Sequence, residues 1–160
     1  MLTNKLTTYL TKLIKTCPEI EKQFIYSKQE NREEKSTFSD PLMEEHHTVV
    51  RGLVHKYHNR ALILLTLNCA AYCRFCTRRR KVSDIQKGVL SDKDLNNIVA
   101  YIKKHPDIKE IILSGGDPLT VPILLQKMLL KLSKLPQIKI IRIGTRLPVT
   151  DPKKINQKLI

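Results

Sequence analysis

The sequence predicts an α/β fold in which parallel strands alternate with helices, and two patterns carry this prediction. Three short apolar runs are typical of strands buried on both faces: residues 61–67, 110–113 and 139–143. Amphipathic patterns typical of helices follow the first two runs: residues 91–104 and 121–135. Strands that alternate with helices pair in parallel through right-handed crossovers, so the segments that follow the strands should gather at one end of the sheet.

Local signals set the boundaries of the other elements. Ser91-Asp92-Lys93-Asp94 has the form of a capping box and begins a helix that His105-Pro106 ends. Asp151-Pro152 is expected to open a third helix after the last strand. Residues 27–48 are polar, lack either period and are interpreted as a long connecting segment. An opening helix that Cys17-Pro18 should stop is predicted from apolar residues three or four positions apart: Leu2, Leu6, Leu10, Leu13 and Ile14.

The composition is that of one globular domain. The chain has 160 residues, of which 41% are hydrophobic and 28% charged, and this length is enough to bury one ordinary core. No stretch approaches the roughly 20 apolar residues that span a bilayer, and no secretion signal opens the sequence. We therefore expect a cytoplasmic protein without a membrane partner.

The chain is strongly basic, with 29 Lys and Arg against 15 Asp and Glu and a net charge of +14. Such an excess can attract nucleic acid. The basic residues are interleaved with apolar ones at helical spacing rather than bunched in one tract, so we favour solvated helix faces over a nucleic-acid partner.

Three of the four cysteines cluster directly after the first predicted strand. Cys69, Cys73 and Cys76 follow the spacing C-x3-C-x2-C. Three thiolates so close in the chain can surround one compact iron–sulfur cluster. Because a cluster of four irons needs four ligands, one iron would keep an open position for an exogenous ligand.

Other interpretations of these thiols stay open. A structural zinc ion could take His55 or His58 as its fourth ligand. Cys73 and Cys76 could form a redox pair, or the cysteines could simply be buried. We favour the cluster because no second Cys or His pair with zinc-site spacing follows Cys76. Cys17 lies far along the chain from the trio and is given no role.

Two further strand ends carry informative segments. Ser114-Gly115-Gly116-Asp117 follows the second strand, and Gly144-Thr145-Arg146 follows the third. The carboxyl ends of parallel strands are where α/β barrels place their active sites, so we expect both segments to adjoin the cysteine loop. Two glycines permit close backbone approach, and the carboxylate of Asp117 can pair with an ammonium group.

These motifs together resemble a known family. The spacing of the three cysteines, with Phe75 before the last, resembles the signature of the radical S-adenosylmethionine (radical SAM) superfamily. CAAYCRFCTRRR (69–80), LSGGDPL (113–119) and IRIGTRLPV (141–149) resemble the lysine 2,3-aminomutase family, including its branch that acts on a lysine of elongation factor P. The resemblance covers about residues 40–160.

The resemblance implies a fold and three cofactors. The fold would be a partial TIM-type (β/α) barrel of about three β-α units, with an N-terminal helix and linker at residues 1–48 and a truncated radical SAM core at residues 49–160. A 4Fe-4S cluster on the three cysteines would bind S-adenosylmethionine (SAM) at its open iron and cleave it reductively. The resulting radical would start the migration of an amino group on a lysine linked to pyridoxal 5′-phosphate (PLP).

The resemblance also implies roles for individual residues. The motif from Ser114 to Asp117 would contact SAM, with Asp117 on the amino group of its methionine portion. Arg78 would receive the substrate carboxylate, which suits a planar guanidinium. We expect its neighbours Arg79 and Arg80 to be solvated.

Assignments around PLP are less specific. Tyr57 and Arg60 match the family stretch beside PLP, although packing and surface charge would explain them equally well. Arg142 and Arg146 could meet anionic cofactor groups or cap loop carbonyls, and we rank them below Asp117.

The chain departs from the family in length. Family members continue through further strands, and no lysine in residues 1–160 matches the one that anchors PLP. Three β-α units should leave an open sheet edge, which a second chain could complete. The substrate stays open between free lysine and a lysine of elongation factor P. Two alternatives also stay open: a non-catalytic cluster-binding remnant, or a basic zinc-stabilised module that binds nucleic acid.

Overall fold

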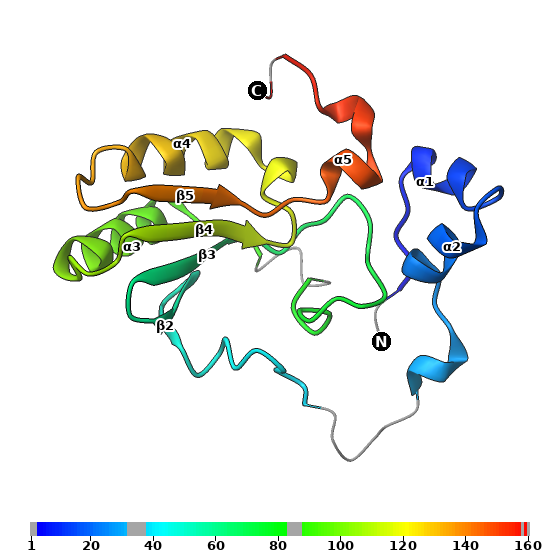
Figure 1. Ribbon diagram of the computed structural model, residues 1–160, viewed down its shortest axis with the longest axis horizontal. Coiled ribbons are helices and arrows are strands. Elements are labelled where there is room, and N and C mark those ends of the chain that lie inside the picture. Colours follow the sequence, from blue (N-terminus) through cyan, green and yellow to red (C-terminus); the bar gives the residue numbers. More distant parts are fainter. Residues whose placement is uncertain (1–2, 32–37, 83–87, 158, 160) are drawn as a thin grey trace.

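A computed structural model describes residues 3–31, 38–82, 88–157 and 159, and a single five-stranded sheet lies at its centre (Figure 1). The strand order is β1-β2-β3-β4-β5. The three predicted strands are confirmed as β3 (Arg60–Thr66), β4 (Glu110–Gly115) and β5 (Ile140–Ile143), and they pair in parallel. Because β1 and β5 lie at opposite edges, the sheet is open, as expected of a partial barrel.

The sheet also contains an antiparallel hairpin that the sequence did not predict. β1 (Thr48–Val50) pairs with β2 (Leu53–Tyr57), and β2 pairs with β3. Gly52 turns the chain between β1 and β2 with a φ of 83°, which favours glycine. Most side chains of both strands are exposed or half-buried, so they lack the apolar alternation that marks a strand in sequence.

The core lies between the sheet and two crossover helices, α3 (Asp92–Lys104) and α4 (Pro122–Leu132), which pack on the same face. The predicted capping box is confirmed, because the Ser91 hydroxyl accepts from the Asp94 amide and the Asp94 carboxylate accepts from the Ser91 amide. Burying each large side chain stabilises the fold by about 1.5–3 kcal/mol. The fully buried residues of this core include Ile63, Leu65, Ile98, Ile102, Ile111, Leu113 and Met128.

The opposite face of the sheet forms the inner side of the partial barrel. Successive strand residues point to opposite faces, so Leu62, Ile112 and Arg142 lie on this side. None of the three is fully buried. The inner face is therefore the open side of the sheet.

The N-terminal segment packs at the carboxyl ends of the parallel strands (Figure 1). The predicted opening helix is observed as α1 (Thr8–Leu13), and Pro18 opens a further helix, α2 (Pro18–Phe24). A proline suits the first position of a helix, where its missing N–H costs nothing. Leu10 and Phe24 are fully buried against Ala71 of the cysteine loop. The N-terminal helices are thus part of the wall around this loop.

Short helical turns complete the chain. They are η1 (Lys28–Asn31), η2 (Pro118–Thr120), α5 (Leu147–Thr150) and η3 (Pro152–Lys154). The helix expected at Asp151-Pro152 is only the single turn η3, and α5 begins before it. Within the described ranges, no helix is long and apolar enough to cross a membrane.

Candidate functional site

A cavity of about 480 Å³ lies at the carboxyl ends of the parallel strands. The three segments that were expected to be neighbours all line it: the cysteine loop, residues 114–117 and residues 144–146. Cys69, Cys73 and Cys76 enter from the loop after β3. Parallel topology alone therefore brought the three strand-end motifs together, as predicted.

The three thiols are free and half-buried around this cavity. Burial, and then the charges of Cys76, Asp117 and Cys73, raise the pKa of Cys69 to about 12. No three His, Cys, Asp or Glu side chains in the described ranges lie close enough to hold one metal ion. Three free thiols that line one cavity are the donor set that a cluster bound by three thiolates requires. Binding would release protons from the thiols.

Gly115 and Gly116 allow the end of β4 to meet the backbone that leads into the cysteine loop. The Gly116 amide donates to the Thr66 carbonyl at 2.6 Å, and the Asp117 amide donates to the Asn68 carbonyl at 2.7 Å. A Cβ on Gly115 would lie 2.1 Å from the Thr66 oxygen, and one on Gly116 would lie 2.2 Å from the Asn68 oxygen. The two glycines therefore allow a close approach between two segments of the chain itself, which the sequence analysis did not predict.

Asp117 ties the loop after β5 to the loop after β4. Its buried carboxylate accepts from the Leu119 amide at 3.0 Å, the Thr145 hydroxyl at 2.7 Å and the Arg146 amide at 2.8 Å. A carboxylate has about four acceptor sites, so these three donors leave little further capacity. Asp117 thus fixes the backbone from which the Arg146 side chain extends.

Arg146 reaches from this loop to a cysteine sulfur. Its Nη1 donates to Cys73 Sγ at 2.9 Å, and its Nη2 donates to Gln23 Oε1 at 3.0 Å. The guanidinium lies 5.1 Å from the ring centre of Phe24 and 4.9 Å from that of Phe75. Burial raises the pKa of Cys73, and the charge and hydrogen bond of Arg146 oppose this effect.

Sequence reasoning missed Gln23 and Phe24 as part of this site. Both belong to α2, which was not predicted. A usable signal was present, because Pro18 followed by Glu19 and Glu21 is a favourable helix start. Nothing in the sequence pattern, however, indicated which strand end this helix would contact.

Arg78 is paired with a glutamate from the connecting segment. The buried Glu44 carboxylate accepts from Nε of Arg78 at 2.9 Å and from Nη2 at 2.6 Å. Nη1 of Arg78 faces Ser114 Oγ at 3.5 Å and the Gly115 carbonyl at 3.3 Å. Glu44 therefore orients Arg78 so that another edge of the guanidinium faces the end of β4.

The neighbouring arginines are ion-paired, so the expectation that they are merely solvated is wrong. Arg80 lies 2.9 Å from Asp40 and 3.0 Å from Glu45, and Arg79 lies 3.3 Å from Glu30. The acidic residues come from η1 and the connecting segment, which sequence patterns could not place against residues 78–80.

A second cavity, of about 280 Å³, lies on the inner face of the sheet. Tyr57 and Arg60 line it, and so do Arg78 and Ser114, which also line the first cavity. The two cavities therefore adjoin at Arg78 and Ser114. Arg60 lies at the amino end of β3 and pairs with Glu110 at 2.7 Å.

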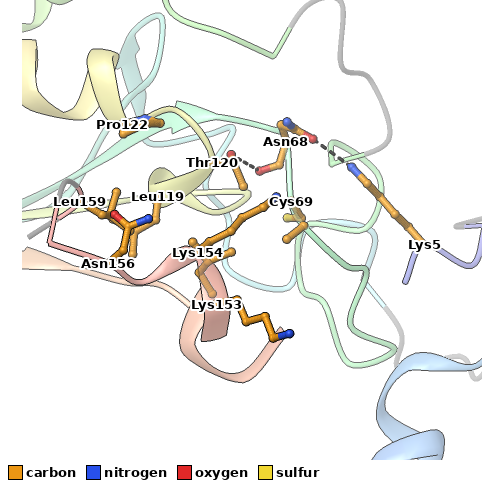
Figure 2. A pocket seen from close by; sticks show the side chains of 12 residues that line it. Lys5, Asn68, Cys69, Leu119, Thr120, Pro122, Lys153, Lys154, Asn156 and Leu159 are labelled. Carbon is orange, nitrogen blue, oxygen red and sulfur yellow. Dashed lines mark hydrogen bonds between the residues drawn. The ribbon is translucent and has the colours of Figure 1, made fainter. Parts of the chain in front are cut away.

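A third cavity, of about 560 Å³, opens on another side of Cys69 (Figure 2). Lys5, Lys153 and Lys154 line it, and among the residues that the structure describes no acidic side chain does. Lys5 Nζ donates to Asn68 Oδ1 at 3.0 Å, and the positive charge of Lys5 acts to lower the pKa of Cys69. Lys5 therefore affects Cys69 through its charge, while its hydrogen bond goes to Asn68.

Comparison with known families agrees with this geometry. A profile described as the radical SAM superfamily matches residues 63–158, which is more than half of the chain. The chain belongs to the radical SAM superfamily. Radical SAM membership implies a 4Fe-4S cluster and SAM, and the matched range contains all three clustered cysteines.

Individual radical SAM relatives are much longer than this chain. L-lysine 2,3-aminomutase of Bacillus subtilis is 40% identical over 144 residues, which is 89% of this chain and 30% of the relative. The protein of the same name from Escherichia coli is 41% identical over 124 residues, which is 77% of this chain and 36% of the relative. The L-lysine 2,3-aminomutase of Fusobacterium nucleatum is 40% identical over 144 residues, which is 89% of this chain and 33% of the relative. The chain thus spans about a third of these curated relatives.

Proposed function

We propose that this chain is the cluster-binding and SAM-binding part of a lysine 2,3-aminomutase-type radical SAM enzyme. The observation that carries the proposal is the first cavity, where three free thiols meet the glycine-rich end of β4. The similarity to L-lysine 2,3-aminomutases over most of the chain supports the reaction type. The substrate would be free lysine or a lysine of elongation factor P.

Two of the segments around the first cavity, the cysteine loop and residues 114–117, have roles in this proposal. Cys69, Cys73 and Cys76 hold the irons, and the motif from Ser114 to Asp117 contacts SAM. When bound, the reduced cluster supplies the electron that cleaves the sulfonium of SAM. The backbone of Gly115 and Gly116 forms the wall at this point, and Asp117 positions it while keeping about one acceptor site for an ammonium group.

The adjoining inner cavity would hold the substrate and PLP. Arg78 lines both cavities and is oriented by Glu44, which suits a residue that receives a carboxylate beside bound SAM. Tyr57 and Arg60 line the inner cavity and would contact PLP. Arg60 shares Glu110 with Arg142, so two guanidinium groups face one carboxylate and leave positive charge for a phosphate.

Further strands would complete this inner cavity. β5 lies at the sheet edge, where an additional parallel strand can pair. More of the same polypeptide or a second chain would supply it, together with a lysine that anchors PLP.

Anaerobic reconstitution with iron and sulfide tests the cluster assignment. We expect about four irons per chain, thiolate-to-iron absorption, and loss of both when Cys73 is replaced by Ala. Cys17→Ala is the matched control, because it removes a cysteine that does not line the cavity. Equal iron content in C73A and the wild type, or zinc in place of iron, would reject the assignment.

Product analysis then tests catalysis. The loaded chain with SAM and a low-potential reductant should release 5′-deoxyadenosine. A chain that holds iron but forms no 5′-deoxyadenosine would instead be a cluster-binding protein without this activity. Salt-sensitive binding of RNA or DNA by a zinc-loaded chain would support the third interpretation.

A further inference from the structure

Arg146 is held from four directions so that one of its nitrogens points at Cys73. Nη1 donates to Cys73 Sγ at 2.9 Å while Nη2 is fixed by Gln23 Oε1 at 3.0 Å. The guanidinium carbon lies over the rings of Phe24 and Phe75 within cation–π distance. Because Asp117 also accepts from the Arg146 amide, both the backbone and the side chain of Arg146 are constrained.

Two of these constraints come from α2 of the N-terminal segment. Phe24 is fully buried beneath the cysteine loop, and the Gln23 carbonyl accepts from the Arg74 amide at 2.8 Å. The Lys5 carbonyl likewise accepts from the Tyr72 amide at 3.0 Å. The N-terminal segment therefore fixes the backbone of the cysteine loop and the guanidinium that contacts it.

We propose that Arg146, positioned by Gln23 and Phe24, raises the reduction potential of a cluster bound at Cys73. This inference rests on the proposed function, because it requires that cluster. On reduction, one electron passes from a low-potential one-electron donor to the cluster, and no covalent bond forms or breaks. The cluster with its thiolates becomes more negative by one charge, so a cationic hydrogen-bond donor on a cysteine sulfur stabilises the reduced form.

This role differs from that of a general positive charge near the site. Lys5 also acts on a cluster cysteine, but it donates its hydrogen bond to Asn68. Arg146 donates directly to a sulfur atom. Hydrogen bonds to the sulfurs and the net charge near a cluster are both known to set its potential, so comparing the two residues separates these effects.

The experiment is a potentiometric titration of the anaerobically reconstituted full chain, followed by electron paramagnetic resonance of the reduced cluster. Arg146→Gln should shift the balance between oxidised and reduced cluster roughly tenfold toward the oxidised form, because a hydrogen bond to a charged group is lost. For one electron this corresponds to a midpoint potential about 59 mV lower. Arg146→Lys keeps the charge and should shift the balance less. Gln23→Ala only loosens the guanidinium and should also cause a smaller shift in the same direction.

Lys5→Gln is the matched control, and we expect its shift to be less than half that of Arg146→Gln. An unchanged potential in R146Q at full iron content, or an equal shift in K5Q, would overturn the inference while leaving the proposed function intact. If R146Q holds no iron, the midpoint potentials of R146K and Q23A test the inference in its place. Potentials equal to that of the wild type in both variants would overturn it. A wild-type chain that holds no cluster would reject the proposed function itself, and the inference with it.

Discussion

The two ends of the parallel sheet differ in the contacts that join neighbouring strands and loops. At the amino ends, polar side chains are paired with one another: Glu110 lies between Arg60 and Arg142, and His55 donates to or accepts from the Tyr101 hydroxyl at 3.0 Å. At the carboxyl ends, backbone segments touch one another through Gly115 and Gly116. Thiols with a raised pKa lie beside these backbone contacts.

This difference indicates what holds each end of the sheet together. At the amino ends, Arg60 and Arg142 share the one carboxylate of Glu110, so side-chain pairing holds the strands together there and still leaves positive charge. At the carboxyl ends, backbone contacts hold the loops in place. The thiols therefore line a cavity whose shape does not depend on pairing between the thiols. The two ends should therefore respond differently to substitution and to pH.

The largest effect is expected where the backbone contacts are tightest. A Cβ in Gly116→Ala would lie 2.2 Å from the Asn68 carbonyl oxygen, and backbone atoms on both sides prevent an inexpensive adjustment. We expect the free energy of unfolding to fall by about 3 kcal/mol or more, measured by urea denaturation of the iron-free chain. Gly144→Ala is the control, because its Cβ would lie 3.4 Å from Ser114 Oγ. Equal stability of the two variants would show that the contact at Gly116 is not rigid.

A similar effect is expected where the cysteine loop continues into Arg78. Glu44→Ala would leave the Arg78 guanidinium, whose side chain is only 17% exposed, without its carboxylate. Loss of one partner of a buried ion pair costs about 3 kcal/mol, which thermal or urea unfolding would detect. Glu45→Gln removes a carboxylate that is 60% exposed and should change stability little. If both variants lose the same stability, burial of the Glu44 pair does not matter.

The thiols give the carboxyl ends an alkaline sensitivity. Burial raises the pKa of Cys69 from 9.0 to about 12, so the unfolded chain loses this proton before the folded chain does. The stability that the protonated Cys69 thiol contributes to the iron-free chain should therefore be present below pH 9 and be lost between pH 9 and 12. A shift from 9.0 to about 12 corresponds to about 4 kcal/mol, and solvent around the half-buried thiol screens part of it. Cys69→Ser should therefore remove on the order of 2 kcal/mol of that loss, seen as a flatter plot of unfolding free energy against pH. Cys17→Ser should keep the wild-type slope, and a wild-type slope in C69S would contradict the assignment.

Local signals in the sequence were sufficient for the parts of the fold that local interactions determine. The capping box at Ser91 and the apolar period of α3 correctly gave that helix, and the alternation of strands and helices correctly gave parallel pairing. The convergence of the cysteine loop with Gly115-Gly116-Asp117 followed from topology. These features need no knowledge of distant contacts.

Features that depend on distant contacts could not be predicted. The partners of Arg78 and Arg146 are Glu44 and Gln23, which lie 34 and 123 residues away along the chain. The hairpin of β1 and β2 was missed because its stability comes from pairing with β3 rather than from its own pattern. Gly115 and Gly116 were expected to let the backbone approach SAM, and pattern alone could not show that they also approach residues 66–68.

The smallest effect is expected at the amino ends, and it should have the opposite pH dependence. Hydrogen bonds from Arg142 and then Arg60 hold the pKa of Glu110 below its ordinary value of 4.5. The stability that this pairing contributes is present above pH 4.5 and is lost as the pH falls below it, because the unfolded chain takes up the proton first. Glu110→Gln should therefore flatten the acid limb of the stability curve while leaving the loss between pH 9 and 12 unchanged. If Glu110→Gln altered the alkaline limb instead, the two ends of the sheet would be coupled rather than independent.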